Sequence, residues 1–211
     1  MTQAVHCQRR FIRPKLDSML RYAITDRFLL GKGDTGRLIE RCGALAQTGI
    51  DFILVREKDL PAGELVQLCR QIAAAAQGSA TQILVSSRVD VALAAGVAGV
   101  HLSSQPGELT PAQVRQLMPS AFISVSCHSL EEIRRARLGG ASAALFAPVF
   151  GKTIQGQEVS AAIGLDALRA ACAEAAPMPV FALGGVTNEN AASCGAAGAA
   201  GIAGIRIFYA A

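Results

Sequence analysis

The chain of 211 residues and 21.9 kDa has the length of one domain. Apolar residues make up 51% of it and charged residues 17%, a composition that excludes a disordered chain. The net charge of +4 is too small to indicate nucleic-acid binding, and no apolar run approaches the roughly 18 residues of a membrane helix.

Residues 1–18 are basic and lack the apolar stretch of a secretory signal, so we predict a short N-terminal arm. Their arginine content leaves a mitochondrial presequence as the alternative. No two of the six cysteines lie closer than 22 residues, which excludes a C-x-x-C metal or redox pair. Reduced thiols in the core of a cytoplasmic protein are the expectation.

Eight short apolar runs predict eight strands. The runs do not alternate with polar residues, as is typical of parallel strands that are covered on both faces. They occupy residues 22–24, 52–55, 83–85, 99–102, 122–125, 144–150, 180–183 and 202–208.

The segments between these runs have helical periodicity. Leu38, Arg41 and Leu45 follow the first run at helical spacing, and Pro61 and Pro111 stand where the first turn of a helix tolerates proline. Alternating strands and helices predict a single α/β domain over residues 19–211, a (β/α)8 TIM barrel. An open doubly wound sheet is the alternative, but no G-x-G-x-x-G follows the first run.

The chain is too short for a complete eighth helix. Only Tyr209, Ala210 and Ala211 follow the last apolar run, so the eighth helix is expected to be truncated. Apolar surface on this flank needs a cover. We expect either the arm of residues 1–18 or a second copy, in a homodimer, to supply it.

Active sites of such barrels lie at the C-terminal ends of the strands, so the residues after each run are the candidates. Arg56 and Lys58 follow the second run and share a face, which fits a phosphate clamp or a solvated charge run. Gly184 and Gly185 follow the seventh run and Arg206 lies near the end of the eighth. Glycine loops there bind phosphate through backbone N–H groups, and tight turns are the alternative.

His128 follows the fifth run, just before a capping box that Ser129 forms with Glu132. Its imidazole is suited to proton transfer near neutral pH, although a structural or solvated histidine has the same pattern. His101 lies inside the fourth run and is expected to have a structural role. Residues 151–162, which include Lys152 and Thr153, form the longest strand-to-helix loop and are expected to be a lid or a plain surface loop.

Six segments together resemble one family. YAITD, FILVREKD, ILVSSRVDVALAAGVAGVHL, SVSCHSLEE, FAPVFGKT and VFALGGVTNEN run in the order seen in thiamin phosphate synthases and in the related TenI-like thiazole tautomerases. The resemblance covers roughly residues 20–208. It implies that a hydroxymethylpyrimidine pyrophosphate loses pyrophosphate and that a thiazole phosphate captures the resulting cation.

The resemblance also implies roles for individual residues. Arg56 and Lys58 would hold the pyrophosphate and Ser126 would lie beside it. Gly184, Gly185 and the loop after the eighth strand would hold the thiazole phosphate. The remaining positions expected to contact substrate are Ser86, Ser87, Lys152, Thr153 and Arg206.

The sequence departs from the synthase pattern where that family binds magnesium. An Asn-Asp pair of the family is Ser86-Ser87 here, and a second aspartate falls within residues 103–107, with Pro106 closest. Magnesium strongly prefers carboxylate oxygen, so we predict no protein-carboxylate metal site and no cofactor; Mg²⁺ enters only if the synthase alternative holds. Lys152 and Thr153 lie in an altered stretch, and Arg206 stands where the family has serine.

These departures favour a thiazole tautomerase-like isomerase in which His128 is the acid and base. The alternatives are a thiamin phosphate synthase and a catalytically silent ligand-binding or regulatory relative. A small phosphate-bearing molecule is the expected partner, and neither nucleic acid nor a membrane is expected. The expected location is the cytoplasm.

Overall fold

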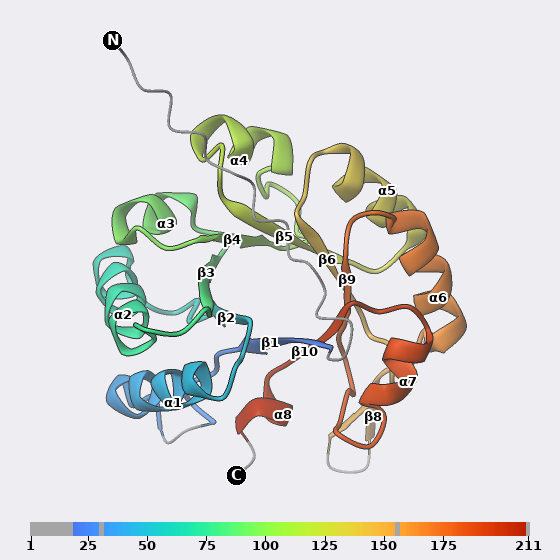
Figure 1. The fold of residues 1–211 in the computed structure, drawn as a ribbon, viewed down its shortest axis with the longest axis horizontal. Helices are drawn as coiled ribbons and strands as arrows, with labels where there is room; N and C mark the ends of the chain where they lie inside the picture. Colours follow the sequence, from blue (N-terminus) through green and yellow to red (C-terminus); the bar gives the residue numbers. More distant parts are fainter. Residues whose placement is uncertain (1–18, 30–31, 155–156, 210–211) are drawn as a thin grey trace.

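A computed structural model describes residues 19–29, 32–154 and 157–209 of the chain (Figure 1). The predicted arm of residues 1–18, with His6 and Cys7, lies outside the described residues. Among the described residues, none of the helices is both long and apolar enough to cross a membrane.

Eight parallel strands close into a barrel, which confirms the predicted TIM-barrel architecture (Figure 1). β1 pairs with both β2 and β10, so the sheet has no open edge and the doubly wound alternative is wrong. The strands are β1 (Leu20–Ile24), β2 (Phe52–Val55), β3 (Gln82–Ser86), β4 (Gly99–Leu102), β5 (Phe122–Cys127), β6 (Ala143–Phe146), β9 (Val180–Ala182) and β10 (Gly201–Gly204).

The helices form a ring outside the barrel (Figure 1). The periodic residues Leu38 and Leu45 are buried, and Pro111 occupies the first turn of a helix that Thr110 caps. The helices are α1 (Thr35–Gln47), α2 (Ala62–Ala75), α3 (Val89–Ala95), α4 (Pro111–Leu117), α5 (Leu130–Leu138), α6 (Gly164–Ala175), α7 (Ala191–Ala196) and α8 (Arg206–Tyr209).

Aromatic side chains fill the inside of the barrel. Tyr22 and Phe52 stack with ring centroids 5.4 Å apart, and Phe181 meets both of them edge-on. Phe122 stacks on Phe52 at 4.5 Å. The interior is therefore a packed core, and a ligand has access only to the mouth formed by the strand ends.

Three stretches differ from the sequence-based prediction. The sixth strand, predicted over residues 144–150, ends at Phe146. Residues 151–162 contain a hairpin of β7 (Lys152–Ile154) and β8 (Gln157–Ser160) in place of an irregular loop. The eighth barrel strand ends at Gly204, not near Arg206. A Cβ at Gly204 would stand 2.7 Å from Cγ2 of Ile207, so the missing side chain lets the chain fold back into α8.

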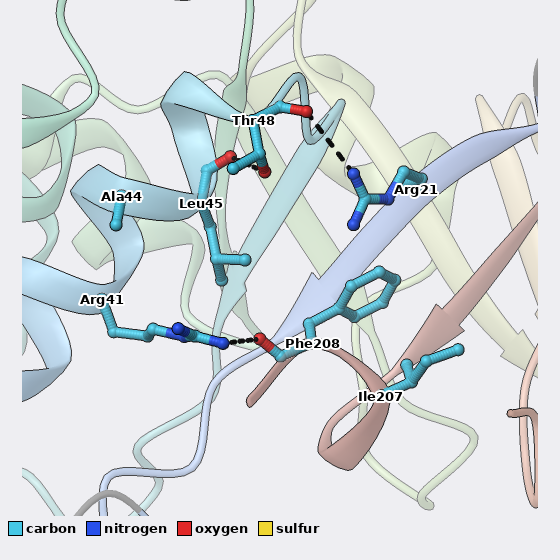
Figure 2. Close-up of a pocket in the computed structure, with 7 residues that line it drawn as sticks. All are labelled: Arg21, Arg41, Ala44, Leu45, Thr48, Ile207 and Phe208. Carbon is cyan, nitrogen blue, oxygen red and sulfur yellow. Dashed lines mark hydrogen bonds between the residues drawn. The ribbon is translucent and has the colours of Figure 1, made fainter. Parts of the chain in front are cut away.

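The truncated eighth helix is present as the four residues of α8, which lie against α1 (Figure 2). Nη2 of Arg41 donates a 2.8 Å hydrogen bond to the carbonyl oxygen of Phe208, and the Arg21 guanidinium lies over the Phe208 ring. A cavity of about 240 Å³ remains on this flank, between these residues and Thr48. The homodimer stays a prediction.

The five described cysteines are free thiols, and four of them are buried: Cys42, Cys69, Cys127 and Cys194. Burial raises the pKa of the Cys69 thiol to about 12, so this thiol is a poor nucleophile at neutral pH.

Candidate functional site

Arg56 and Lys58 follow β2 at the barrel mouth with exposed side chains, whereas Glu57 between them is buried. Their alternation follows the two-residue period of the strand, as the sequence predicted. Neither cation forms an ion pair within the described part of the chain. They line a cavity of about 290 Å³ together with Asp26, Phe28, Glu57 and Asp59.

Glu57, which lies between these two cations in the sequence, forms a buried ion pair with Arg27. Glu57 accepts hydrogen bonds from Oγ1 of Thr25 at 2.6 Å and from Nη1 of Arg27 at 3.0 Å. Arg27 also binds Asp59 through both guanidinium Nη atoms. This bidentate contact lowers the pKa of the Asp59 carboxyl group. Arg27 pairs with both acids, whereas Arg56 and Lys58 pair with neither among the described residues, so these two cations stay available to an anion.

Ser87 and Glu108 meet on the neighbouring side of the mouth. Ser87, directly after β3, donates a hydrogen bond of 2.5 Å from Oγ to Oε2 of Glu108, and it adopts a φ of +60°. Backbone N and Oγ of Ser103 donate to the same carboxylate oxygen at 3.1 and 2.8 Å. In the sequence, Pro106 is the residue closest to the second magnesium aspartate of the family that this chain resembles. In the structure, the residue of this loop that meets Ser87 is Glu108.

Sequence reasoning missed Glu108 because the loop after β4 has no periodicity that fixes which residue turns inward. Its acidic side chain six residues after Leu102 was the available signal. Ser86, whose side chain is buried, precedes Ser87 at the end of β3.

The donor set at Ser87 and Glu108 contains one carboxylate and two serine hydroxyls. The described residues hold no group of three His, Cys, Asp or Glu side chains that could enclose a metal ion. Magnesium usually keeps several waters and binds one or two carboxylates together with phosphate oxygens of a substrate. Glu108 therefore fits a magnesium ion that arrives with a phosphorylated substrate, and it does not make a protein cage.

His101 is buried in β4, as expected for a structural residue, but it reaches the mouth through a serine. Its Nε2 lies 2.9 Å from Oγ of Ser126, and its Nδ1 lies 3.0 Å from Oγ of Ser124. Burial lowers the pKa of His101 to about 4; Glu108 raises it, while the charges of Arg56 and Lys58 lower it further. His101 is therefore neutral at pH 7.

His128 follows β5 and is exposed at the mouth. Its Nδ1 donates a 2.7 Å hydrogen bond to the carbonyl oxygen of Ala147. The second ring nitrogen, Nε2, takes no part in this bond. Ser129 caps α5 as predicted, by accepting from the backbone N of Glu132. The Glu132 carboxylate completes the turn one residue earlier than predicted, at the backbone N of His128.

Gly184 and Gly185 follow β9 with positive φ of +91° and +65°. A Cβ at Gly185 would stand 2.8 Å from the carbonyl oxygen of Gly151, so glycine permits this close approach. Asn190 holds the loop closed by donating to the carbonyl oxygen of Gly185 and accepting from Thr187. The N–H groups of Gly184 and Gly185 donate to no acceptor among the described residues, so they remain candidates for binding an anion.

Three residues predicted to contact substrate remain: Arg206, Lys152 and Thr153. Only the backbone of Lys152 and Thr153 is described. Arg206 is exposed in the first turn of α8, beyond the end of β10. Lys152 and Thr153 lie in β7, opposite Ser160 and Glu158 of β8.

Comparison with known proteins bears on the whole barrel. The family profile described as "Thiamine monophosphate synthase" (TMP-TENI) matches residues 21–208. A Geobacter sulfurreducens protein named "Putative thiamine-phosphate synthase" is 40% identical over 180 residues, which are 83% of this chain and 79% of that protein. A "Thiamine-phosphate synthase" of Moorella thermoacetica is 36% identical over 156 residues, 74% of this chain and 72% of that protein.

A solved structure agrees with these similarities. The "Thiamine phosphate pyrophosphorylase" from Pyrococcus furiosus superposes with a TM-score of 0.77 at 28% identity, covering 91% of each chain. The barrel mouth described above lies within the matched residues.

Proposed function

Because the chain belongs to the thiamine monophosphate synthase family, we propose that it couples a pyrimidine pyrophosphate to a thiazole phosphate with release of pyrophosphate. The observation that carries this proposal is that Arg56 and Lys58, which have no ion-pair partner among the described residues, lie at a mouth that also presents the Glu108 carboxylate. The names of the relatives favour the same reaction.

In this proposal Arg56 and Lys58 hold the pyrophosphate of the first substrate through charge-assisted hydrogen bonds. Ser126 donates to the same group from the end of β5. The free N–H groups of Gly184 and Gly185 bind the phosphate of the second substrate. The two anionic groups thus bind at the ends of different strands of one mouth.

Glu108 is the residue that would hold magnesium, with phosphate oxygens and water completing its coordination. When bound, the ion would neutralise charge on the departing pyrophosphate. Ser87 and Ser103 orient the Glu108 carboxylate by donating to Oε2.

The test is incubation of the protein with both substrates and Mg²⁺, followed by assay for thiamin phosphate. We expect product from the wild type and a fall of at least tenfold with Glu108→Gln. Glu64→Gln, on the exposed start of α2, is the matched control and should leave the rate unchanged. Absence of product from the wild type would contradict the proposal.

Thiazole tautomerisation is the second candidate, because Nε2 of His128 bonds to none of the described residues and the position of Ser87 has no carboxylate. Here Nε2 of His128 removes a proton from one ring position and returns one at another. His128→Asn should lower isomerisation of a thiazole phosphate carboxylate by roughly 10²–10⁴-fold while phosphate binding persists. Ligand binding without either activity would favour the silent-relative alternative.

A further inference from the structure

A chain of hydrogen bonds runs from the barrel core to the mouth. The Tyr22 hydroxyl lies 2.9 Å from Oγ of Ser124, which lies 3.0 Å from Nδ1 of His101. Nε2 of His101 lies 2.9 Å from Oγ of Ser126. Tyr22 and Ser124 are fully buried and His101 is nearly so, whereas Ser126 is partly exposed at the end of β5.

The direction of this chain follows from a count of donors and acceptors. Tyr22 is fully buried with its ring against those of Phe52 and Phe181, and Ser124 is the one hydrogen-bond partner of its hydroxyl within the described residues. A buried phenol hydrogen needs an acceptor. Tyr22 must therefore donate to Ser124, since the opposite direction would leave its hydrogen unbonded in an apolar core.

The next two bonds then have a fixed direction as well. The Ser124 hydroxyl has accepted from Tyr22, and its own hydrogen has one other described partner, Nδ1 of His101. Nδ1 is consequently an acceptor without a hydrogen. A neutral imidazole carries a single N–H, so that hydrogen is on Nε2 and is donated to Ser126. The lowered pKa of His101 agrees with a neutral ring.

We propose that Tyr22 and Ser124 hold His101 in the Nε2–H tautomer, so that Ser126 keeps its own hydroxyl hydrogen free to donate into the mouth. Ser126 can then donate this hydrogen to an acceptor oxygen of a ligand, such as one of a phosphate group, without giving up its contact with His101. The phosphate contact rests on the function proposed above, whereas the tautomer does not. Tyr22, Ser124 and His101 are positioning residues, because they act on the ligand only through Ser126.

The tautomer is measured directly by ¹⁵N NMR of the full chain with labelled histidine. The chain has three histidines, so His101 can be assigned by its absence from a His101→Gln sample. We expect a pyridine-type Nδ1 and a protonated Nε2 for His101 at pH 7. A protonated Nδ1 in the wild type would overturn the proposal without any further variant.

Tyr22→Phe removes only the hydroxyl and keeps the ring in the core. We expect it to mix the two His101 tautomers and to weaken binding of inorganic pyrophosphate by about two- to tenfold, in proportion to the fraction that leaves the Nε2–H form. Phe181→Leu is the control, because it removes packing against Tyr22 and leaves the hydrogen bonds in place. A tautomer unchanged in Tyr22→Phe, or changed equally in Phe181→Leu, would refute the role of the hydroxyl.

Failure of the two proposals can be told apart. If wild-type protein has the Nε2–H tautomer but does not bind pyrophosphate, the proposed function fails while the positioning chain stands. If it binds pyrophosphate with His101 in the Nδ1–H tautomer, the positioning chain fails alone.

Discussion

The Ser87 hydroxyl donates a 2.5 Å hydrogen bond to the Glu108 carboxylate, although the two residues are 21 positions apart in the sequence. Ser87→Asp would place a second carboxylate beside the first. Repulsion should destabilise the metal-free protein by about 1–2 kcal/mol, and Mg²⁺ should restore the loss. Thermal unfolding with and without Mg²⁺ measures both effects. Ser104, exposed in the loop that carries Glu108, is the control position. Mg²⁺ should stabilise Ser104→Asp less than Ser87→Asp, and equal stabilisation would exclude a paired site.

Arg56 and Lys58 should contribute to pyrophosphate affinity and little to stability, because both side chains are exposed and unpaired within the described structure. Arg56→Ala or Lys58→Ala should each weaken pyrophosphate binding about 10–100-fold, measured by calorimetry, and the loss should shrink at high salt. Arg37→Ala is the control, since Arg37 is also exposed but lies on α1. If Arg56→Ala and Lys58→Ala lose no more pyrophosphate affinity than Arg37→Ala, the two cations are ordinary solvated surface residues.

Arg27 should contribute to stability, in contrast to the two exposed cations. Arg27→Met leaves the buried Glu57 without its cation and should lower the free energy of unfolding by about 3–5 kcal/mol. Arg88→Met removes an exposed partner of Asp90 and should cost less than about 1 kcal/mol. Denaturant unfolding of both variants tests the contrast, and similar costs would contradict a structural role for the buried pair.

The buried His101 should make stability depend on pH. Its pKa falls from 6.5 to about 4 on folding, chiefly through burial, so the unfolded chain binds the proton more tightly. The contribution of His101 to the free energy of unfolding is therefore fully present above pH 6.5. It declines as the pH falls toward 4, by about 2–3 kcal/mol at pH 4.5. His101→Gln should lack this part of the pH dependence. Parallel unfolding curves for wild type and variant between pH 7.5 and 4.5 would rule it out.

Gly185→Ala should be more damaging than an alanine at another glycine with positive φ. Both Gly185 and Gly49 have φ values that disfavour alanine, but a Cβ at Gly49 meets nothing within 4 Å, whereas one at Gly185 meets Gly151 and Phe150. Gly49→Ala should cost about 1–2 kcal/mol. Gly185→Ala should cost more and should also weaken phosphate binding, because its N–H is displaced. Phosphate titration of both variants separates the two effects.

Sequence patterns alone determined most of the barrel. Apolar runs bounded by helical segments predicted all eight barrel strands, because strands covered on both faces need continuous apolar side chains. Strand ends then indicated the mouth, and the two-residue period placed Arg56 and Lys58 together. The last strand was predicted too long, since the apolar residues of α8 continue the pattern and only the contact of Gly204 with Ile207 marks the turn.

Only the tertiary structure decided which polar groups meet. Tyr22 and Ser124 are 102 residues apart and come together because the barrel closes on itself. Glu108 reaches Ser87 because the loop after β4 brings it to the end of the neighbouring strand β3, and no periodic pattern constrains the length or direction of such a loop. Burial patterns are local and can be read along the chain, whereas hydrogen bonds between distant side chains depend on how the loops and the closed sheet fit together in space.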